Sequence, residues 1–212
     1  MEQVQPSTYA VGDIHGEVSL ARQLIAMLPL RDDDTLVFLG DYLDYGEDSA
    51  ATITFLSHLG QSRRNCVFLR GNHDDAWLDA WDGVRFARRP LLRGARKAWD
   101  DFKGAPPREA GRWLAATRSG YEDDYAYYTH AGLSARLSFA RTPDAAKIWG
   151  DDSFWARDAD WGKPVVVGHY PLPAPLITSR RICIDTRARD TGILTAVRLP
   201  DRALFQTPPR AP

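Results

Sequence analysis

Five short motifs along the chain place a glycine beside aspartate, asparagine or histidine. In order they are Gly12-Asp13-Ile14-His15-Gly16, Gly40-Asp41-Tyr42-Leu43-Asp44, Gly71-Asn72-His73-Asp74, His130-Ala131-Gly132 and Gly168-His169. Four of the five directly follow an apolar, β-branched or aromatic run, so their polar side chains are expected at strand ends. Oxygen and nitrogen ligands gathered in this way are typical of transition-metal sites. The motifs therefore predict a two-metal site of the kind that hydrolyses phosphoesters.

The predicted metal ligands are Asp13, His15, Asp41, Asn72, His130 and His169. Asp13 and His15 lie two residues apart in a tight turn, where both can reach one ion. Asp41 closes the next strand and can bridge two ions with its two oxygens. A mixed oxygen and nitrogen set suits manganese, iron or zinc better than calcium or magnesium, and we expect two ions, with manganese as the first choice.

His73 is predicted to be the proton donor of the site. It follows Asn72 directly, so its side chain must point in a different direction, and it can protonate a leaving alkoxide. Asp44 is the best candidate for the carboxylate that fixes its tautomer and raises its pKa. Taken singly, each motif is more often an ordinary loop or core feature. Four of the five histidines lie in these motifs, however, and this concentration favours a metal site.

The first 75 residues alternate between strands and helices. Strands are expected at 9–11, 35–39 and 66–69, with helices at 20–28 and 51–59. This alternation indicates βαβ units and a parallel sheet, in which sites form beyond the carboxyl ends of the strands.

The pattern of expected helices and strands changes after residue 75. Residues 76–120 are rich in tryptophan and arginine, with helical stretches at 93–103 and 108–118, and we expect a helical cap there. Short strands at 124–129, 165–167, 182–185 and 194–199 suggest a second sheet. The proline-rich tail from Thr207 is expected to fray. The whole chain, residues 1–212, is predicted to be a single α/β domain.

Composition and charge bear on the binding partners, the cellular location and the state of the cysteines. A formal net charge of −1 gives no strong case for binding a nucleic acid polymer or a membrane. The N-terminus lacks an apolar leader and no apolar run is long enough to span a bilayer, so a cytoplasmic protein is the default expectation. Cys66 and Cys183 lie in apolar runs and are expected to be buried free thiols. The oligomeric state is not predicted.

At these residues the chain resembles the calcineurin-like metallophosphoesterase superfamily and, within it, the PPP family of serine/threonine protein phosphatases. The family pattern is GDxHG, GDYxDRG, GNHE/D, HxG and GH, and the similarity runs from about residue 9 to residue 198. Residues 155–158, 165–171, 184–186 and 191–197 look like the bacterial branch. The resemblance implies a four-layer α/β/β/α sandwich with the site at its edge.

The resemblance also implies roles for individual residues. Asp13, His15 and Asp41 would hold the first metal. Asp41, Asn72, His130 and His169 would hold the second. His73 with Asp44 would form the acid pair. Arg157 matches by position an arginine that grips the phosphate, and Asn72 would also face the phosphate.

Two departures from the family pattern concern phosphate binding. Tyr45 stands where the family has arginine, so a forked, charged contact is reduced to a single neutral hydrogen bond from the tyrosine. That loss costs about 1.5–3 kcal/mol. Arg187 stands where the family usually has glycine, and it either replaces part of the lost guanidinium or is a solvated loop residue. Asp74, in place of glutamate, is shared with some diadenosine-polyphosphate hydrolases.

The predicted cap leaves two interpretations open. Its interleaved arginines and tryptophans can form a basic, aromatic wall for a phosphopeptide or a nucleotide base. Alternatively, the tryptophans fill the interior of the cap while the arginines are solvated, and this reading is favoured by nearby acidic residues, among them Asp79, Asp82, Asp100 and Asp101.

Three functional hypotheses follow. The leading one is a bacterial-type serine/threonine protein phosphatase that cleaves phosphomonoesters of a phosphorylated protein with a metal-activated hydroxide. The alternative is a hydrolase of small phosphoesters, namely dinucleoside polyphosphates such as diadenosine tetraphosphate, or other nucleotides. The third is a weakly catalytic phospho-binding module, which the missing arginine motivates.

Overall fold

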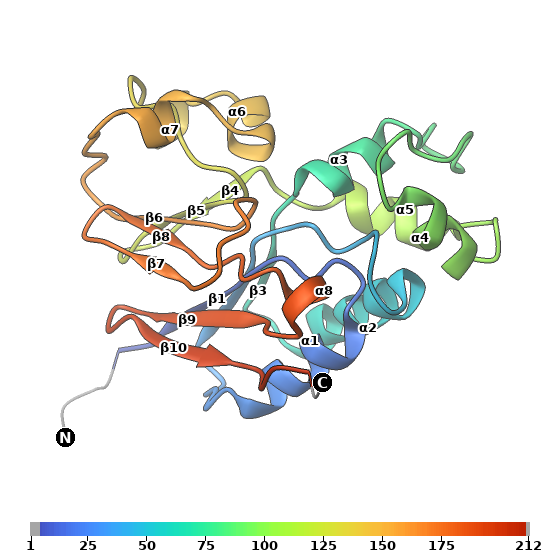
Figure 1. Ribbon diagram of the computed structural model, residues 1–212, viewed down its shortest axis with the longest axis horizontal. Helices are drawn as coiled ribbons and strands as arrows, with labels where there is room; N and C mark the ends of the chain where they lie inside the picture. The colour runs from blue at the N-terminus through green and yellow to red at the C-terminus, as the bar shows by residue number, and fades with distance from the viewer. Residues whose placement is uncertain (1–4, 211–212) are drawn as a thin grey trace.

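Two five-stranded sheets lie face to face in the computed structural model, which describes residues 5–210 (Figure 1). The strands of the first sheet, in spatial order, are β10 (Ala203–Gln206), β9 (Thr195–Leu199), β1 (Thr8–Val11), β2 (Thr35–Phe38) and β3 (Cys66–Phe68). Those of the second are β4 (Gly120–Glu122), β5 (Tyr127–Thr129), β6 (Val165–Val167), β8 (Arg181–Cys183) and β7 (Leu176–Ile177).

Strand direction determines where the loops meet. β1, β2 and β3 run parallel to one another in the first sheet, and β5, β6 and β8 run parallel in the second. The remaining strands pair antiparallel at the flanks, so both sheets are mixed. The carboxyl ends of parallel strands lie at one edge of a sheet, and the predicted ligands follow five of these six strands, namely β1, β2, β3, β5 and β6.

Alternation along the strands divides the interior into three cores. Tyr9 and Val11 pack under the helices, whereas Ala10 between them packs between the sheets. On the other side, Val166 points between the sheets, and its neighbours Val165 and Val167 form the third core. Because successive side chains of a strand point to opposite faces, each apolar strand can serve two cores.

Helices cover both outer faces and complete four layers. α1 (Val18–Met27) and α2 (Ser49–Ser62) contribute leucines such as Leu24 and Leu56 to the core beneath the first sheet. α6 (Asp144–Trp149) and α7 (Ser153–Ala156) lie over the second sheet, where Phe154 is fully buried (Figure 1). The predicted α/β/β/α sandwich is therefore confirmed.

Three helices occupy the segment predicted as a cap. They are α3 (Asn72–Leu78), α4 (Ala95–Asp101) and α5 (Arg108–Ala115). α4 and α5 contact α2, so the group packs beside the first sheet (Figure 1). Trp77 is fully buried, and Trp81, Trp99 and Trp113 pack against the same core. The tryptophans thus fill the interior, as the second interpretation of this segment expected.

Some local expectations need correction. The strand predicted over 124–129 begins only at Tyr127, and residues 120–122 form a separate partner strand. The tail does not fray at Thr207, whose buried hydroxyl bonds to the backbone of Gly192 and Leu194. Further along, Arg210 pairs with the buried Glu17, and residues 211–212 lie outside the described range.

Two other expectations concern the thiols and the membrane. Cys183 is fully buried and Cys66 is half-buried, and both are free thiols. Between residues 5 and 210, no helix combines the length and apolar character needed to cross a bilayer.

Candidate active site

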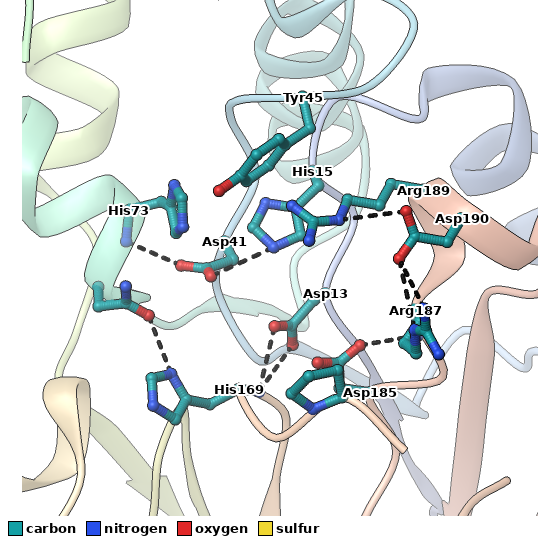
Figure 2. Close-up of a pocket in the computed structure, with 12 residues that line it drawn as sticks. Asp13, His15, Asp41, Tyr45, His73, His169, Asp185, Arg187, Arg189 and Asp190 are labelled. Atoms are coloured by element: carbon teal, nitrogen blue, oxygen red, sulfur yellow. Dashed lines mark hydrogen bonds and ion pairs between the residues drawn. The ribbon is translucent and has the colours of Figure 1, made fainter. Parts of the chain in front are cut away.

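The loops that follow β1, β2, β3, β6 and β8 meet at a pocket of about 440 Å³ (Figure 2). Its lining residues are Asp13, His15, Asp41, Tyr45, Asn72, His73, His169, Pro171, Asp185, Arg187, Arg189 and Asp190. His130 is fully buried and contacts Asn72 and His169. The structure therefore brings all six predicted metal ligands together, and we refer to Asp13, His15, Asp41, Asn72, His130 and His169 as the metal cluster.

Glycines beside the ligands allow the backbone to approach the carboxylates. A Cβ atom at Gly71 would lie 2.0 Å from Asp41 Oδ1, and one at Gly168 would lie 1.9 Å from Asp13 Oδ1. Any side chain at either position would displace a carboxylate. The pairing of glycine with ligand in the sequence motifs thus has a steric cause.

Three ligand atoms of the metal cluster converge from the second sheet and from α3. Asn72 Oδ1 lies 3.0 Å from His130 Nε2 and 2.9 Å from His169 Nδ1, and the two nitrogens are 3.1 Å apart. His130 Nδ1 donates to the Leu39 carbonyl at 3.0 Å, so its Nε2 carries a lone pair rather than a proton. Lone pairs of Nε2 and the amide oxygen then face each other, an arrangement that a cation relieves.

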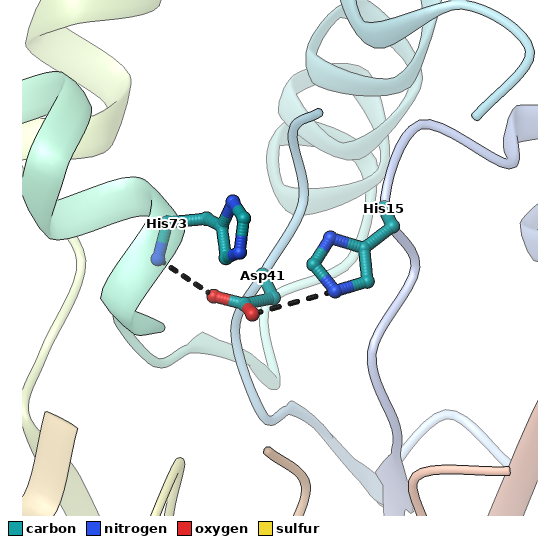
Figure 3. Close-up of side chains that lie close together, drawn as sticks. All are labelled: His15, Asp41 and His73. Carbon is teal, nitrogen blue, oxygen red and sulfur yellow. Dashed lines mark hydrogen bonds and ion pairs between the residues drawn. The ribbon is translucent and has the colours of Figure 1, made fainter. Parts of the chain in front are cut away.

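Asp41 lies between this group and the ligands of the first sheet. One carboxylate oxygen, Oδ1, is 3.5 Å from His130 Nε2, and the other, Oδ2, is 3.5 Å from His15 Nε2. The His15 ring donates its Nδ1 proton to the Leu43 carbonyl at 3.0 Å, which again leaves Nε2 open. His15 and His73 flank Asp41 (Figure 3). The two oxygens of Asp41 are therefore placed to serve two ions.

Burial sets the protonation preferences of the metal cluster. It raises the pKa of Asp13 well above its usual value and that of Asp41 to about 7. It lowers the pKa of His15 to about 3 and that of His169 to about 4. The imidazoles are thus neutral and can offer lone pairs, and a nearby positive charge would stabilise the ionised form of the buried carboxylates. Such a set of donors is suited to binding a divalent cation.

His73 lies next to the cluster but is held by a different partner. Its Nδ1 is 2.6 Å from Asp44 Oδ2, and the Trp77 indole donates to the other Asp44 oxygen at 3.0 Å. Burial alone would lower the pKa of His73, but the hydrogen bond to Asp44 and the surrounding carboxylates outweigh it, so the pKa is raised. Nε2, the ring atom that Asp44 does not hold, remains for a substrate.

The site is built on strained backbone. Between residues 5 and 210, eight residues other than glycine have positive φ angles, and six of them were predicted site residues: His15, Asp41, Asp44, Tyr45, His169 and Arg187. Such conformations cost about 1–3 kcal/mol each and persist only where the surroundings enforce them. Their concentration here is typical of functional loops.

Asp74 has a supporting role that the sequence did not reveal. Its buried carboxylate accepts the backbone N–H groups of Asp41 at 2.8 Å, Tyr42 at 3.0 Å and Gly71 at 2.9 Å. It therefore ties the loop after β2 to the loop after β3, which carry Asp41 and Asn72, two of the predicted metal ligands.

One side of the pocket carries arginines, and we refer to Tyr45, Arg187 and Arg189 as the arginine rim. The Arg189 guanidinium lies 3.8 Å from the centroid of the Tyr45 ring (Figure 2). Arg187 also lines the pocket, and its side chain donates to Asp190 at 3.4 Å. Arg189 comes from α8 (Ala188–Thr191), a four-residue helix that the sequence pattern did not predict.

Two further site residues depart from expectation. Arg157, predicted to grip the phosphate, is exposed on the turn after α7 and is not among the residues that line the pocket. Asp185 does line it, although it was not among the predicted site residues. It directly follows the apolar run that ends at Ile184, so the strand-end signal that located Asp41 could also have located Asp185.

Sequence comparisons place these features in a family. The family model described as calcineurin-like phosphoesterase matches residues 7–195. Two relatives, from Halalkalibacterium halodurans and Geobacillus sp., are each named bis(5'-nucleosyl)-tetraphosphatase PrpE (asymmetrical). They are 25% identical over 236 and 237 aligned residues, and each alignment covers 95% of this chain and 94% of the relative. A symmetrical bis(5'-nucleosyl)-tetraphosphatase of Pseudomonas putida is 25% identical over 207 residues, covering 90% of this chain and 70% of that protein.

Solved structures share the fold at low identity. A candidate diadenosine tetraphosphatase matches with a TM-score of 0.76 and 20% identity, covering 100% of this chain and 96% of the other. A serine/threonine phosphatase of Saccharomyces cerevisiae matches with a TM-score of 0.56 and 15% identity, covering 97% of this chain and 80% of the other. At such identities these likenesses concern the fold alone.

Proposed function

The chain belongs to the calcineurin-like phosphoesterase family, and from that premise we propose that it hydrolyses dinucleoside polyphosphates such as diadenosine tetraphosphate. The main support is the end-to-end similarity to two relatives named as tetraphosphatases, which extends over nearly the full length of both chains. The leading hypothesis from the motifs, a protein phosphatase, has no comparable support, because the likeness to the yeast enzyme concerns the fold.

The metal cluster fits two divalent ions, and we assign its residues accordingly. Asp13, His15 and Asp41 would hold one ion, and Asp41, Asn72, His130 and His169 the other. Manganese suits this donor set, with iron and zinc as substitutes. When bound, the ions would lower the pKa of a water molecule and neutralise phosphoryl charge.

His73, supported by Asp44, would protonate the leaving group. His73 Nε2 would donate a proton to the oxygen that departs from phosphorus. Asp44 holds the opposite ring nitrogen at 2.6 Å and stabilises the protonated ring, while the Trp77 indole fixes Asp44. This chain of buried hydrogen bonds keeps the donor in one orientation.

The arginine rim would bind phosphate oxygens. Arg189 and Arg187 supply two guanidinium groups beside the metal cluster, and charge-assisted contacts of this kind suit a polyanion. Tyr45, which replaces an arginine of the motif, supports Arg189 with its ring. The loss of a charge at position 45 is thereby offset by a charge from another segment.

Activity measurements with three substrates test the proposal. Purified protein supplied with Mn²⁺ would be assayed on diadenosine tetraphosphate, a phosphothreonine peptide and p-nitrophenyl phosphate. We expect the highest kcat/KM on the dinucleotide. A tenfold preference for the peptide would restore the protein-phosphatase hypothesis. Turnover of none of the three, with metals bound, would indicate a phospho-binding module instead.

A further inference from the structure

A second pocket adjoins the metal pocket and shares a wall with it. Its volume is about 530 Å³, and Tyr45, Arg189 and Asp190 line both pockets. Each cavity falls in the size range of small-molecule sites, roughly 300–1,000 Å³. A phosphomonoester needs only the first pocket, whereas an elongated ligand can pass Arg189 into the second.

The acidic groups of the second pocket are already engaged within the protein. Glu17 pairs with Arg210, Glu47 accepts a serine hydroxyl of α1 at 2.6 Å, and Asp190 accepts from an arginine of its own loop. Arg93, by contrast, is exposed and forms no side-chain hydrogen bond or ion pair within the described part of the chain, residues 5–210. Its guanidinium is therefore available to an anionic ligand.

Tyr45 lines the second pocket together with Arg189 and Arg93. The Arg189 guanidinium sits over its ring at 3.8 Å. The loop before α4 touches the same ring, because a Cβ atom at Gly94 would lie 3.0 Å from two of its carbons, and Arg93 is the preceding residue. Segments almost a hundred residues apart in the chain thus bring Arg93 and Arg189 to the lining of one pocket, beside Tyr45.

We propose that Arg189 and Arg93 form a track for the polyphosphate chain of the substrate. The phosphate to be cleaved binds at the metal cluster, the next phosphates pass Arg189 at the border of the pockets, and the distal phosphates reach Arg93. Guanidinium groups pair with phosphate oxygens in a two-pronged geometry, which suits successive phosphates. This inference rests on the proposed function, because it names the part of the molecule that selects long substrates over short ones.

Steady-state kinetics of three variants test the track. Arg93→Ala and Arg189→Ala remove its two charges, and Arg85→Ala is the matched control, since Arg85 is an exposed arginine that lines neither pocket. We expect Arg189→Ala to raise the KM for diadenosine tetraphosphate by roughly ten- to a hundred-fold, the loss of one charge-assisted contact. Arg93→Ala should raise it at least five-fold more than it raises the KM for p-nitrophenyl phosphate. The control should match the wild type on both substrates.

A second measurement separates the track from the proposed function. Tripolyphosphate and inorganic phosphate would be compared as inhibitors of p-nitrophenyl phosphate hydrolysis at a fixed concentration of free Mn²⁺. We expect the wild type to bind tripolyphosphate at least ten-fold more tightly than phosphate, and Arg93→Ala to lose most of that difference. This assay needs no turnover of a dinucleotide, so failure to hydrolyse diadenosine tetraphosphate would refute the proposed function alone. An unchanged inhibitor ratio in Arg93→Ala and Arg189→Ala would refute the track.

Discussion

The metal cluster and the arginine rim lie in one pocket but are built in different ways. The cluster residues follow five parallel strands of two sheets, and hydrogen bonds hold several of their side chains, among them those of Asp13, His15 and His130, in one orientation. The rim residues lie on loops and on the four-residue α8, and Arg189 is about one-third exposed. The predicted metal ligands thus sit at the ends of buried strands, whereas the residues proposed to contact phosphate lie on more exposed loops.

This difference explains how the chain can differ from the motif at position 45 and still keep its predicted metal ligands together. A change on a loop removes one phosphate contact, and a neighbouring loop can supply another. A change in the cluster has no such substitute, because its residues lie at strand ends and the carboxylates of Asp13 and Asp41 pack closely against Gly168 and Gly71. Variants in the two regions should therefore behave differently, and the size of the difference is measurable.

Asp41→Asn should have the largest effect. It removes the charge that faces both groups of ligands, so metal content and activity should fall together. We expect kcat/KM to drop by roughly three decades, because metal ions supply several kcal/mol of charge stabilisation. Metal analysis beside the assay checks this, with the exposed Asp82→Asn as the control. Full metal content in Asp41→Asn would refute the bridging role.

His73→Asn should separate proton transfer from metal binding. Losing a positioned acid lowers turnover by roughly two decades or more, while the metal cluster is untouched. His58→Asn is the matched control, because His58 is an exposed histidine on α2. Activity would be measured together with metal content. Near-normal turnover in His73→Asn would show that another group protonates the leaving oxygen.

Asp74→Ala should reveal how the cluster is supported. Three backbone N–H groups lose their buried acceptor, which should lower the free energy of unfolding by about 1–3 kcal/mol. Metal affinity should fall by roughly ten- to a hundred-fold, as when other supporting groups of metal ligands are removed. Chemical denaturation and metal titration measure the two effects. Unchanged metal affinity in a destabilised variant would restrict Asp74 to folding.

Tyr45 variants should have the smallest effect and should reveal how the rim works. Tyr45→Leu removes the ring beneath Arg189, and the KM for diadenosine tetraphosphate should rise roughly three- to ten-fold, the scale of one cation–π contact. Tyr45→Phe keeps the ring and should behave like the wild type. Equal losses in both variants would instead assign the phosphate contact to the phenol hydroxyl, as the sequence alone suggested.

The difference between the metal cluster and the arginine rim also explains which site residues could be predicted from the sequence. Asp13 and Asp41 each follow an apolar strand and one glycine or two residues ending in glycine, and Asn72 follows the next strand after Arg70 and Gly71, so local pattern and position in the fold agree. Arg189 lies on a short helix whose place against Tyr45 depends on tertiary packing, which leaves no periodic signal. The family resemblance predicted a phosphate contact for Arg157, but the turn after α7 leaves this side chain exposed and outside the pocket lining.

Anomalous diffraction from crystals grown with Mn²⁺ tests the central claim most directly. The claim is that strand-end ligands from both sheets enclose two ions that share Asp41. We predict two manganese peaks per chain, with Asp13 and His15 beside one, His130 and His169 beside the other, and Asp41 between them. A single peak, or none among these side chains, would contradict the account.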